Sequence, residues 1–268
     1  MALDVKEIYA WGILGCGWLG QGLCQALSQD HIRVWGSGRS KKTAGEIARN
    51  GADPIMFDAA GPRSGQSEWP RSQSLLVSWP PSAGMEAYQE AANHAQTRTE
   101  WTVLISSTSV YPGEEGVYTE EDAIRRVSPH SGQCLLDIER LFDPSRTTIL
   151  RAGGLFGPLR NPRHFLRGRV PERLREAVNM VHLTDVIRAI RFSAEHHLEG
   201  AYNLVAPKPV SRGSFYHAAG ACEHPVDPTE LPIGRRVLAD KITATGFAFT
   251  WPDAAQACRE LQSQTPRP

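Results

Sequence analysis

A glycine-rich turn near the start of the chain constrains its fold more than any other feature. The turn is Gly15-Cys16-Gly17-Trp18-Leu19-Gly20, and an apolar run at residues 8–14 leads directly into it. Leu19, Leu23 and Leu27 then recur at helical spacing, which indicates a strand, a tight turn and a helix in that order. In such a turn the first glycine allows the reversal, the second lets a pyrophosphate approach the backbone, and the third lets the helix pack on the strand. Because the N–H groups at a helix start attract phosphates, the sequence predicts a dinucleotide site at residues 15–20.

Length, charge and cysteine content narrow the class of protein. The chain has 268 residues and a formal net charge of zero, so nothing global points to nucleic acid or to a membrane surface. No apolar run approaches the length of a membrane span. The five cysteines are scattered and lack CxxC spacing, so they are interpreted as reduced thiols of a cytoplasmic protein, without a metal site. The composition therefore predicts a cytoplasmic protein that binds small molecules.

The stretch after the first helix should select the cofactor. An apolar run at residues 31–35 is followed by Gly-Ser-Gly and then by Arg39 and Ser40. A fold that binds NAD places an acidic residue here for the ribose hydroxyl, whereas an arginine accommodates the 2′-phosphate of NADP. No acid ends this strand, so the sequence favours NADP over NAD. The alternative is that the cations of this segment only cover a solvated loop.

Short apolar runs alternate with helical segments through the next hundred residues, which predicts a Rossmann-type, doubly wound parallel sheet of the α/β class. Strands are expected at residues 54–57, 75–78, 101–105 and 147–150, helices at 41–51 and 85–95, and a surface loop between residues 59 and 74. Ligands in such sheets bind beyond the carboxyl ends of the strands. The polar residues Asp58, Ser78 and Ser107 all fall at such ends.

Several motifs in one order make a family resemblance specific. Besides the glycine turn, these are the Ser-Ser-Thr-Ser-Val-Tyr run at residues 106–111 and the segments 150–158, 181–186 and 201–204. The chain thereby resembles the extended short-chain dehydrogenase/reductases, the NAD-dependent epimerase/dehydratase family, which acts mostly on sugar nucleotides. The resemblance implies an NAD(P)-binding domain at residues 1–158 and a small C-terminal substrate lobe, mainly residues 159–268, with segments around 178–206 returning to the sheet domain.

The resemblance also implies roles for particular residues. Gly15, Gly17 and Gly20 would hold the pyrophosphate of the cofactor, and Trp18 and Leu19 between them are also expected to bind the cofactor. Asp58 would meet the adenine, and Ser78 and Trp79 would line the adenosine and ribose side. Ser107 stands where the family keeps the hydroxyl of its catalytic triad, with Thr108 and Ser109 beside it for the substrate. The alternative for Ser107 is a hydroxyl that only satisfies backbone groups at a strand end.

The chain departs from the family where the general acid/base is expected. The family uses a YxxxK motif, but Ser131 stands at the tyrosine position and Leu135 at the lysine position. Since a positioned acid/base contributes about 10² to 10⁴-fold to the rate, another group must replace it if the usual chemistry is kept. Tyr111 is the candidate adopted here, with Tyr118 and His130 as the other options.

Two charged segments flank the predicted substrate lobe. Glu114 to Asp122 is acidic and is interpreted as a solvated loop. The segment from residue 160 to 175 is basic, and its Arg160 and Arg163 are candidates for binding an anionic substrate, because guanidinium groups match phosphate and carboxylate geometry. The alternative for this segment is a helix with a charged outer face.

Two classes of function fit these observations. In the first, the chain is an NADP-linked oxidoreductase or epimerase-like enzyme that acts on a sugar nucleotide or a similar anionic small molecule with a non-standard proton donor. In the second, it is a non-catalytic dinucleotide-binding sensor or regulatory protein. The resemblance adds a homodimer formed through two helices of the sheet domain.

Overall fold

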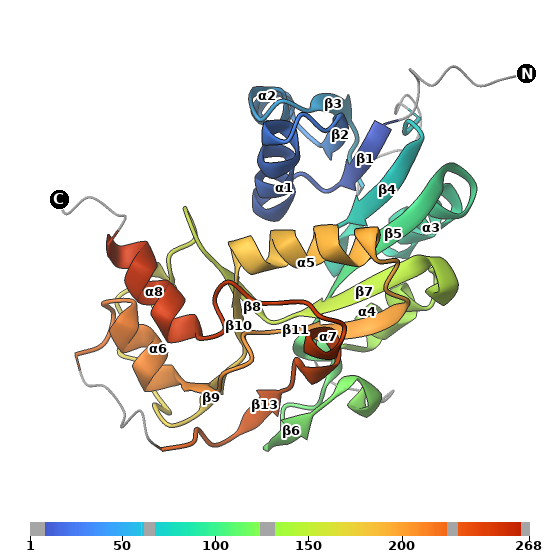
Figure 1. The fold of residues 1–268 in the computed structure, drawn as a ribbon. Coiled ribbons are helices and arrows are strands. Elements are labelled where there is room, and N and C mark those ends of the chain that lie inside the picture. The colour runs from blue at the N-terminus through green and yellow to red at the C-terminus, as the bar shows by residue number, and fades with distance from the viewer. Residues whose placement is uncertain (1–8, 60, 62–67, 124–131, 224–229, 264–268) are drawn as a thin grey trace, which may run out of the picture. The chain divides into compact units, whose positions relative to one another are not determined.

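A seven-stranded sheet dominates the computed structural model, which describes residues 9–59, 61, 68–123, 132–223 and 230–263 (Figure 1). The sheet has the order β11-β7-β5-β4-β1-β2-β3. Its strands are β1 (Tyr9–Leu14), β2 (Val34–Gly38), β3 (Asp53–Met56), β4 (Ser72–Val77), β5 (Thr99–Ser107), β7 (Thr147–Ala152) and β11 (Gly200–Leu204). The pairs β1–β2, β2–β3, β1–β4 and β4–β5 are parallel. Because the winding reverses between β1 and β4, a ligand crevice is expected at the carboxyl ends of these two strands. The predicted Rossmann-type sheet is confirmed.

Helices and short strands complete the fold. The helices are α1 (Trp18–Gln29), α2 (Lys41–Arg49), α3 (Met85–Arg98), α4 (Gly132–Glu139), α5 (Leu183–Glu195), α6 (Arg212–Ala218), α7 (Asp240–Ala244) and α8 (Ala254–Ser263). The two-stranded pairs are β6 (Gly116–Tyr118) with β13 (Arg235–Val237), β8 (Gly154–Phe156) with β10 (Met180–His182), and β9 (Ala177–Val178) with β12 (Val210–Ser211). Among the described residues, every helix is too short or too polar to cross a membrane.

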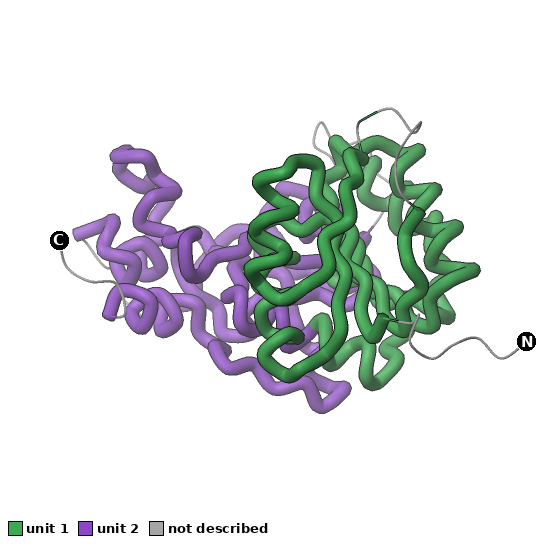
Figure 2. The backbone as a smooth tube through the Cα atoms, turned by 90° about the horizontal axis from the view of Figure 1, so that it is seen from above, with its two compact units in different colours: residues 1–106, 129–150, 190–201 green, residues 107–128, 151–189, 202–268 purple. Residues whose placement is uncertain are grey.

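The chain divides into two compact units, each with its own core (Figure 2). Unit 1 comprises residues 1–106, 129–150 and 190–201, and unit 2 comprises residues 107–128, 151–189 and 202–268. The core of unit 1 includes Trp35, Trp69, Tyr88 and Leu104. In unit 2, Phe156 and Phe215 pack edge to face in a cluster contributed largely by α6 and α8. Each unit therefore buries apolar surface of its own.

Two predicted boundaries in unit 1 need correction. β2 begins at Val34 and runs through Gly38, three residues beyond the apolar run from which it was predicted. Its last residues are small because a Cβ at Gly36 would lie 2.4 Å from the Cys16 sulfur. The predicted loop before β4 also contains a core residue, Trp69, which is 5% exposed and packs edge to face on Phe57 with ring centroids 4.7 Å apart. Packing from other elements decides both points.

The two charged segments of unit 2 also differ from their interpretations. The acidic segment contains β6, which pairs with β13, and its Glu120 carboxylate accepts a hydrogen bond of 2.7 Å from the backbone N–H of Asn203. It is therefore not simply a solvated loop. The basic segment contains a 3₁₀ turn at Pro162–His164 and residues with positive φ, among them Arg167 and Arg173. Residues 160 to 175 form no α-helix, so the alternative of a charged helix is wrong.

A buried histidine in unit 1 should make stability depend on pH. His94 of α3 is 9% exposed, and its Nε2 has no hydrogen-bond partner among the described residues. Burial lowers its pKa from 6.5 to about 4. Between pH 6.5 and about pH 4 the imidazole is protonated in the unfolded chain but not in the folded chain. The free energy of unfolding is therefore highest above pH 6.5 and decreases as the pH falls to about 4. The loss should reach about 3 kcal/mol in the free energy of unfolding.

Urea unfolding at pH 7, 5.5 and 4 tests this expectation, with His94→Leu as the comparison. The variant should lose less free energy of unfolding on acidification than the wild type. Equal losses in the two proteins would contradict the assignment to His94.

Candidate functional site

The predicted glycine turn follows β1 directly and is fixed by the two neighbouring strands. Gly15 has a φ of +99°, a conformation that side chains other than glycine rarely adopt. Its N–H donates to the Ser37 hydroxyl at 3.0 Å, and the Ser78 hydroxyl donates to its carbonyl at 2.9 Å. The N–H of Ser78 also donates to the Leu14 carbonyl at 2.9 Å. Residues at the ends of β2 and β4 therefore hold the turn in one conformation.

The start of α1 leaves space for a ligand. Gly17 is the N-cap residue, and a Cβ added there would meet nothing within 4 Å. A Cβ at Gly20, by contrast, would lie 2.6 Å from the Gly15 carbonyl oxygen. Gly20 therefore allows the helix to pack against the turn, whereas Gly17 keeps the approach to the helix N-terminus open. These are the two properties that a pyrophosphate site requires.

A cavity of about 350 Å³ lies beside this turn, entirely within unit 1. It is bounded by the turn itself and by the segments that follow β2, β3 and β4. Its lining residues are Cys16, Gly17, Gln21, Ser37, Gly38, Arg39, Thr43, Phe57, Asp58, Ala59, Trp79, Pro80, Ser82 and Ala83. It thus lies at the carboxyl ends of β1 and β4, where the order of the sheet predicts a ligand crevice.

The predicted residues for adenosine and the 2′-phosphate meet around this cavity. Arg39 is exposed, and its side chain makes no hydrogen bond or ion pair with any other described residue. Ser40 is not among the lining residues but caps α2, since its hydroxyl accepts a hydrogen bond of 3.1 Å from the Thr43 N–H. Asp58 follows β3, and Trp79 stacks on Phe57 with ring centroids 5.7 Å apart. A guanidinium, an exposed carboxylate and a stacked indole therefore face one cavity.

Other predicted cofactor residues do not line the cavity. The Leu19 side chain is buried on the core side of α1, Trp18 is half-buried, and Ser78 holds the turn. Sequence reasoning overlooked Gln21, whose amide donates to Glu46 at 2.9 Å, and Thr43. Both are ordinary polar residues at helical positions, and no local pattern marks them.

In unit 2, Ser107 begins a 3₁₀ turn at Thr108–Val110. Its hydroxyl accepts a hydrogen bond from the Ser109 N–H and donates to the Ser109 hydroxyl, both at 3.1 Å. The Thr108 side chain is buried, and its carbonyl accepts a hydrogen bond of 3.2 Å from Arg235 Nη1. Ser107 and Ser109 are half-buried, so their hydroxyls are partly accessible. The Ser107 hydroxyl therefore satisfies a backbone N–H at the end of a strand, as its alternative interpretation predicts. The residue is nevertheless partly exposed, so a ligand could still reach it.

Tyr111 belongs to a buried polar network in the same unit. It is 3% exposed, and its hydroxyl donates to Asn203 Oδ1 at 2.6 Å and accepts from Arg151 Nη1 at 3.2 Å. Arg151 also donates to the Glu120 carbonyl at 2.9 Å. Burial is the main cause that raises the pKa of Tyr111. Arg151 and Asn203, which are distant in the sequence, lower the pKa and hold the phenol in position, but burial outweighs them and makes it a weaker acid.

The remaining predicted residues are not among those that line the cavity at the glycine turn. Leu135 of α4, at the family's lysine position, is 5% exposed, whereas Ser131 and His130 lie outside the described residues. Arg160 is exposed. Arg163 lies with Arg169 and His217 on a cavity of about 700 Å³ within unit 2. The position on α4 where the family has its lysine is therefore occupied by the buried Leu135.

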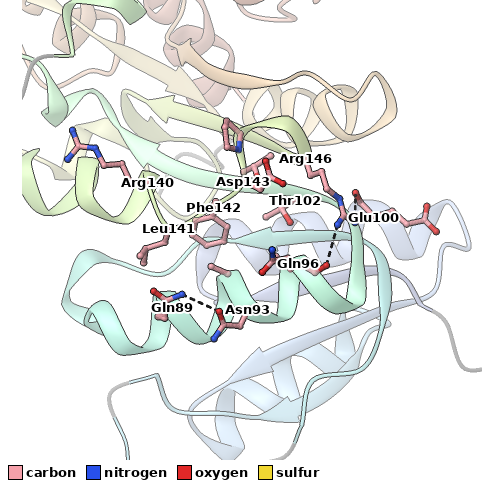
Figure 3. Close-up of a pocket in the computed structure, with 14 residues that line it drawn as sticks. Gln89, Asn93, Gln96, Glu100, Thr102, Arg140, Leu141, Phe142, Asp143 and Arg146 are labelled. Atoms are coloured by element: carbon pink, nitrogen blue, oxygen red, sulfur yellow. Dashed lines mark hydrogen bonds between the residues drawn. The ribbon is translucent and has the colours of Figure 1, made fainter.

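Another cavity of unit 1 is not a candidate for this site (Figure 3). Its volume is about 320 Å³, and it lies between α3 and the segment that joins α4 to β7. Gln89 and Asn93 point toward it from α3, joined by a hydrogen bond of 3.1 Å. Glu100 and Thr147 place it near the amino ends of β5 and β7. Doubly wound sheets bind their ligands at the opposite ends of the strands.

Comparisons with known proteins agree with this arrangement. No family model matches the chain. Protein YeeZ of Escherichia coli K12 is 28% identical over 263 residues, which cover 90% of this chain and 96% of YeeZ. A candidate NAD-dependent epimerase/dehydratase from Methylobacillus flagellatus superposes with a TM-score of 0.72 at 20% identity, covering 95% of this chain and 98% of that one.

A second solved structure was determined with ligands bound. The Bordetella bronchiseptica enzyme WbmG, in complex with NAD and UDP, superposes with a TM-score of 0.71 at 14% identity, covering 98% of this chain and 96% of that one. At these identities the comparisons establish the fold. The chain therefore has the fold of the NAD-dependent epimerase/dehydratases, the extended short-chain dehydrogenase/reductases, and the resemblance indicated by its motifs is confirmed at that level.

Proposed function

We propose that this chain binds NADP at the glycine turn and acts as an epimerase/dehydratase-like oxidoreductase on a sugar nucleotide or a similar anionic molecule. The observation that carries the cofactor proposal is the cavity beside the turn, on which Gly17, Arg39 and Asp58 come together. Bound there, the cofactor would supply hydride chemistry. The open N-terminus of α1 would hold its pyrophosphate, Arg39 its 2′-phosphate and Asp58 its adenine. The NAD and UDP bound to WbmG support the ligand class.

Arg39→Ala tests the cofactor preference. NADPH affinity should fall by about tenfold to hundredfold, because a charge-assisted hydrogen bond contributes about 1.5 to 3 kcal/mol. NADH affinity should change by less than about twofold, because NADH lacks the 2′-phosphate. Titration calorimetry with both cofactors measures this, with Arg49→Ala, at the exposed C-terminal end of α2, as a charge-matched control. Equal losses for NADPH and NADH would show that Arg39 does not recognise the 2′-phosphate.

We propose that the Ser107 hydroxyl positions the reacting hydroxyl or carbonyl of the substrate. The support is its accessible location at the end of β5 together with the family resemblance. The proton donor of this proposal is non-standard, since Leu135 replaces the lysine. Tyr111 is retained as the donor to be tested, although its hydroxyl already donates to Asn203.

Ser107→Ala should lower turnover by about tenfold or more, because one substrate hydrogen bond is lost, and should leave NADPH affinity within twofold. Product formation from a panel of sugar nucleotides, followed by chromatography with the cofactor present, measures the first effect, and calorimetry measures the second. Ser145→Ala, which removes an exposed hydroxyl in the 3₁₀ turn before β7 and outside the cofactor cavity, is the matched control. Unchanged turnover in Ser107→Ala would exclude a catalytic hydroxyl at this position.

The second candidate function is a non-catalytic dinucleotide sensor. Two observations favour it: Leu135 is buried where the family has its lysine, and the Tyr111 hydroxyl is held in a buried network. Tight NADPH binding without turnover on any sugar nucleotide would favour the sensor, and turnover would exclude it.

A cytoplasmic location and a homodimer complete the proposal. The five cysteines are present as thiols, which supports a reducing compartment, and the dimer follows from the family resemblance alone. Sedimentation of the purified chain tests the dimer.

A further inference from the structure

Arg235 is the residue of unit 2 whose surroundings the proposed function does not explain. It lies on β13, where its carbonyl accepts a hydrogen bond of 3.0 Å from the Asn179 amide. The backbone N–H of Val237 donates a hydrogen bond of 2.8 Å to Oδ1 of the same Asn179 side chain. Asn179 therefore fixes the strand on both sides of Arg236, and the Arg235 side chain starts from a rigid position.

The side chain of Arg235 reaches the 3₁₀ turn that carries the predicted substrate residues. Its Nη1 donates to the Thr108 carbonyl at 3.2 Å. Thr108 stands between Ser107 and Ser109, whose hydroxyls are hydrogen-bonded to each other. The Arg235 guanidinium thus contacts the residue that directly follows Ser107 in the sequence, and Ser107 carries the hydroxyl proposed to meet the reacting group of the substrate.

The charge of Arg235 has no counter-ion among the described residues. Some arginines of unit 2 do have a carboxylate partner: Arg175 lies 3.2 Å from Glu230, and Arg212 lies 3.3 Å from Glu176. Arg235 is half-buried, and this loss of solvent lowers its pKa, while the nearby Tyr118 phenol acts in the opposite direction. Of its five N–H donors, the structure gives a protein acceptor within the described part of the chain to one. A partly desolvated cation without a carboxylate is unfavourable unless a ligand supplies the anion.

We infer that Arg235 binds an oxyanion of the substrate, a carboxylate or a phosphoryl group carried close to the carbon that reacts at Ser107. The inference rests on the proposed function for the role of Ser107. The planar fork of a guanidinium can bind two oxygens of either group at once. Arg235 therefore takes the anion-binding role that the sequence suggested for Arg160 and Arg163.

The test compares Arg235→Met with Arg236→Met in the full chain. Arg236 is also half-buried, but adjacent residues of a strand point to opposite faces, so its loss should leave the site intact. Affinities for UDP-glucuronate, UDP-glucose, UDP and uridine are measured by calorimetry with NADP present at saturation. NADPH affinity and melting temperature are measured for each variant to exclude misfolding and loss of the cofactor site.

We expect Arg235→Met to weaken its anionic ligand at least tenfold, Arg236→Met to change it less than twofold, and NADPH affinity to be the same in both. A loss confined to UDP-glucuronate identifies a ring carboxylate as the oxyanion, whereas an equal loss for the three charged uridine ligands identifies the diphosphate. Arg235→Lys should recover part of the lost affinity, because it keeps the charge without the fork. Equal affinities of wild type and Arg235→Met would overturn the inference.

The failure of the sugar-nucleotide proposal can be told apart from the failure of this inference. If the wild type binds none of the uridine ligands, the sugar-nucleotide proposal fails, and citrate and inorganic pyrophosphate become the probes. Binding of either that Arg235→Met weakens tenfold would uphold an oxyanion site for another substrate class. If the wild type binds neither, Arg235 is not an oxyanion site.

Discussion

Gly17→Val is expected to reduce NADPH affinity more than about hundredfold, a loss of about 2.7 kcal/mol, while the protein remains folded. The valine side chain would fill the space in front of the α1 N-terminus, where the pyrophosphate has to approach the backbone. The protein should stay folded because a Cβ at this position meets nothing within 4 Å, and the extended φ and ψ of Gly17 suit a β-branched residue. Calorimetric titration with NADPH measures the loss, and circular dichroism and the melting temperature report on the fold.

Gly113→Val is a suitable control for this substitution. A Cβ at Gly113 also meets nothing within 4 Å, and the residue is exposed in unit 2, outside the glycine turn. Its NADPH affinity should equal that of the wild type. Gly20→Ala is unsuitable, because its Cβ would lie 2.6 Å from the Gly15 carbonyl and would disturb the fold itself. Wild-type affinity in Gly17→Val would mean that the turn does not bind the pyrophosphate.

Asp185→Ala is expected to lower the free energy of unfolding by about 3 to 5 kcal/mol. The carboxylate is fully buried at the start of α5 and accepts hydrogen bonds from the N–H groups of Thr250 at 2.6 Å and Trp251 at 2.9 Å. Removing it leaves both amides of the segment before α8 without their acceptor, and each unsatisfied buried group costs about 1 to 3 kcal/mol. Asp185 therefore has a structural role.

Urea unfolding and amide hydrogen exchange measure this effect. The Thr250 and Trp251 amides should exchange much faster in Asp185→Ala, and Asp185→Asn should be intermediate, since one acceptor oxygen remains. Asp240→Ala, at an exposed position in the first turn of α7, should change stability by less than about 0.5 kcal/mol. A loss below 1 kcal/mol in Asp185→Ala would show that other groups satisfy the two amides.

The cofactor half of the candidate site could be predicted closely from the sequence, because its signals are local. The glycine turn, the strand before it and the helix after it occupy consecutive residues, and Arg39 and Asp58 directly follow their strands. Parallel strands bring such ends together at one edge of the sheet, so a list of strand ends approximates a list of site residues. The boundary of β2 could not be predicted in the same way, since it depends on the contact between Gly36 and the Cys16 sulfur.

The sequence by itself thus determined the class of the sheet, the glycine turn after its first strand and the absence of a YxxxK motif, because these are properties of residue type and spacing. Only the tertiary structure decided which polar side chains share a neighbourhood in unit 2. Tyr111 meets Asn203 across 92 residues of sequence, and Arg235 meets Thr108 across 127. Hydrophobic periodicity specifies which face of a strand or helix is buried, but contains no information about which distant residue satisfies a buried phenol or borders a guanidinium. Those pairings follow from strand order and register, which are fixed when the whole chain packs.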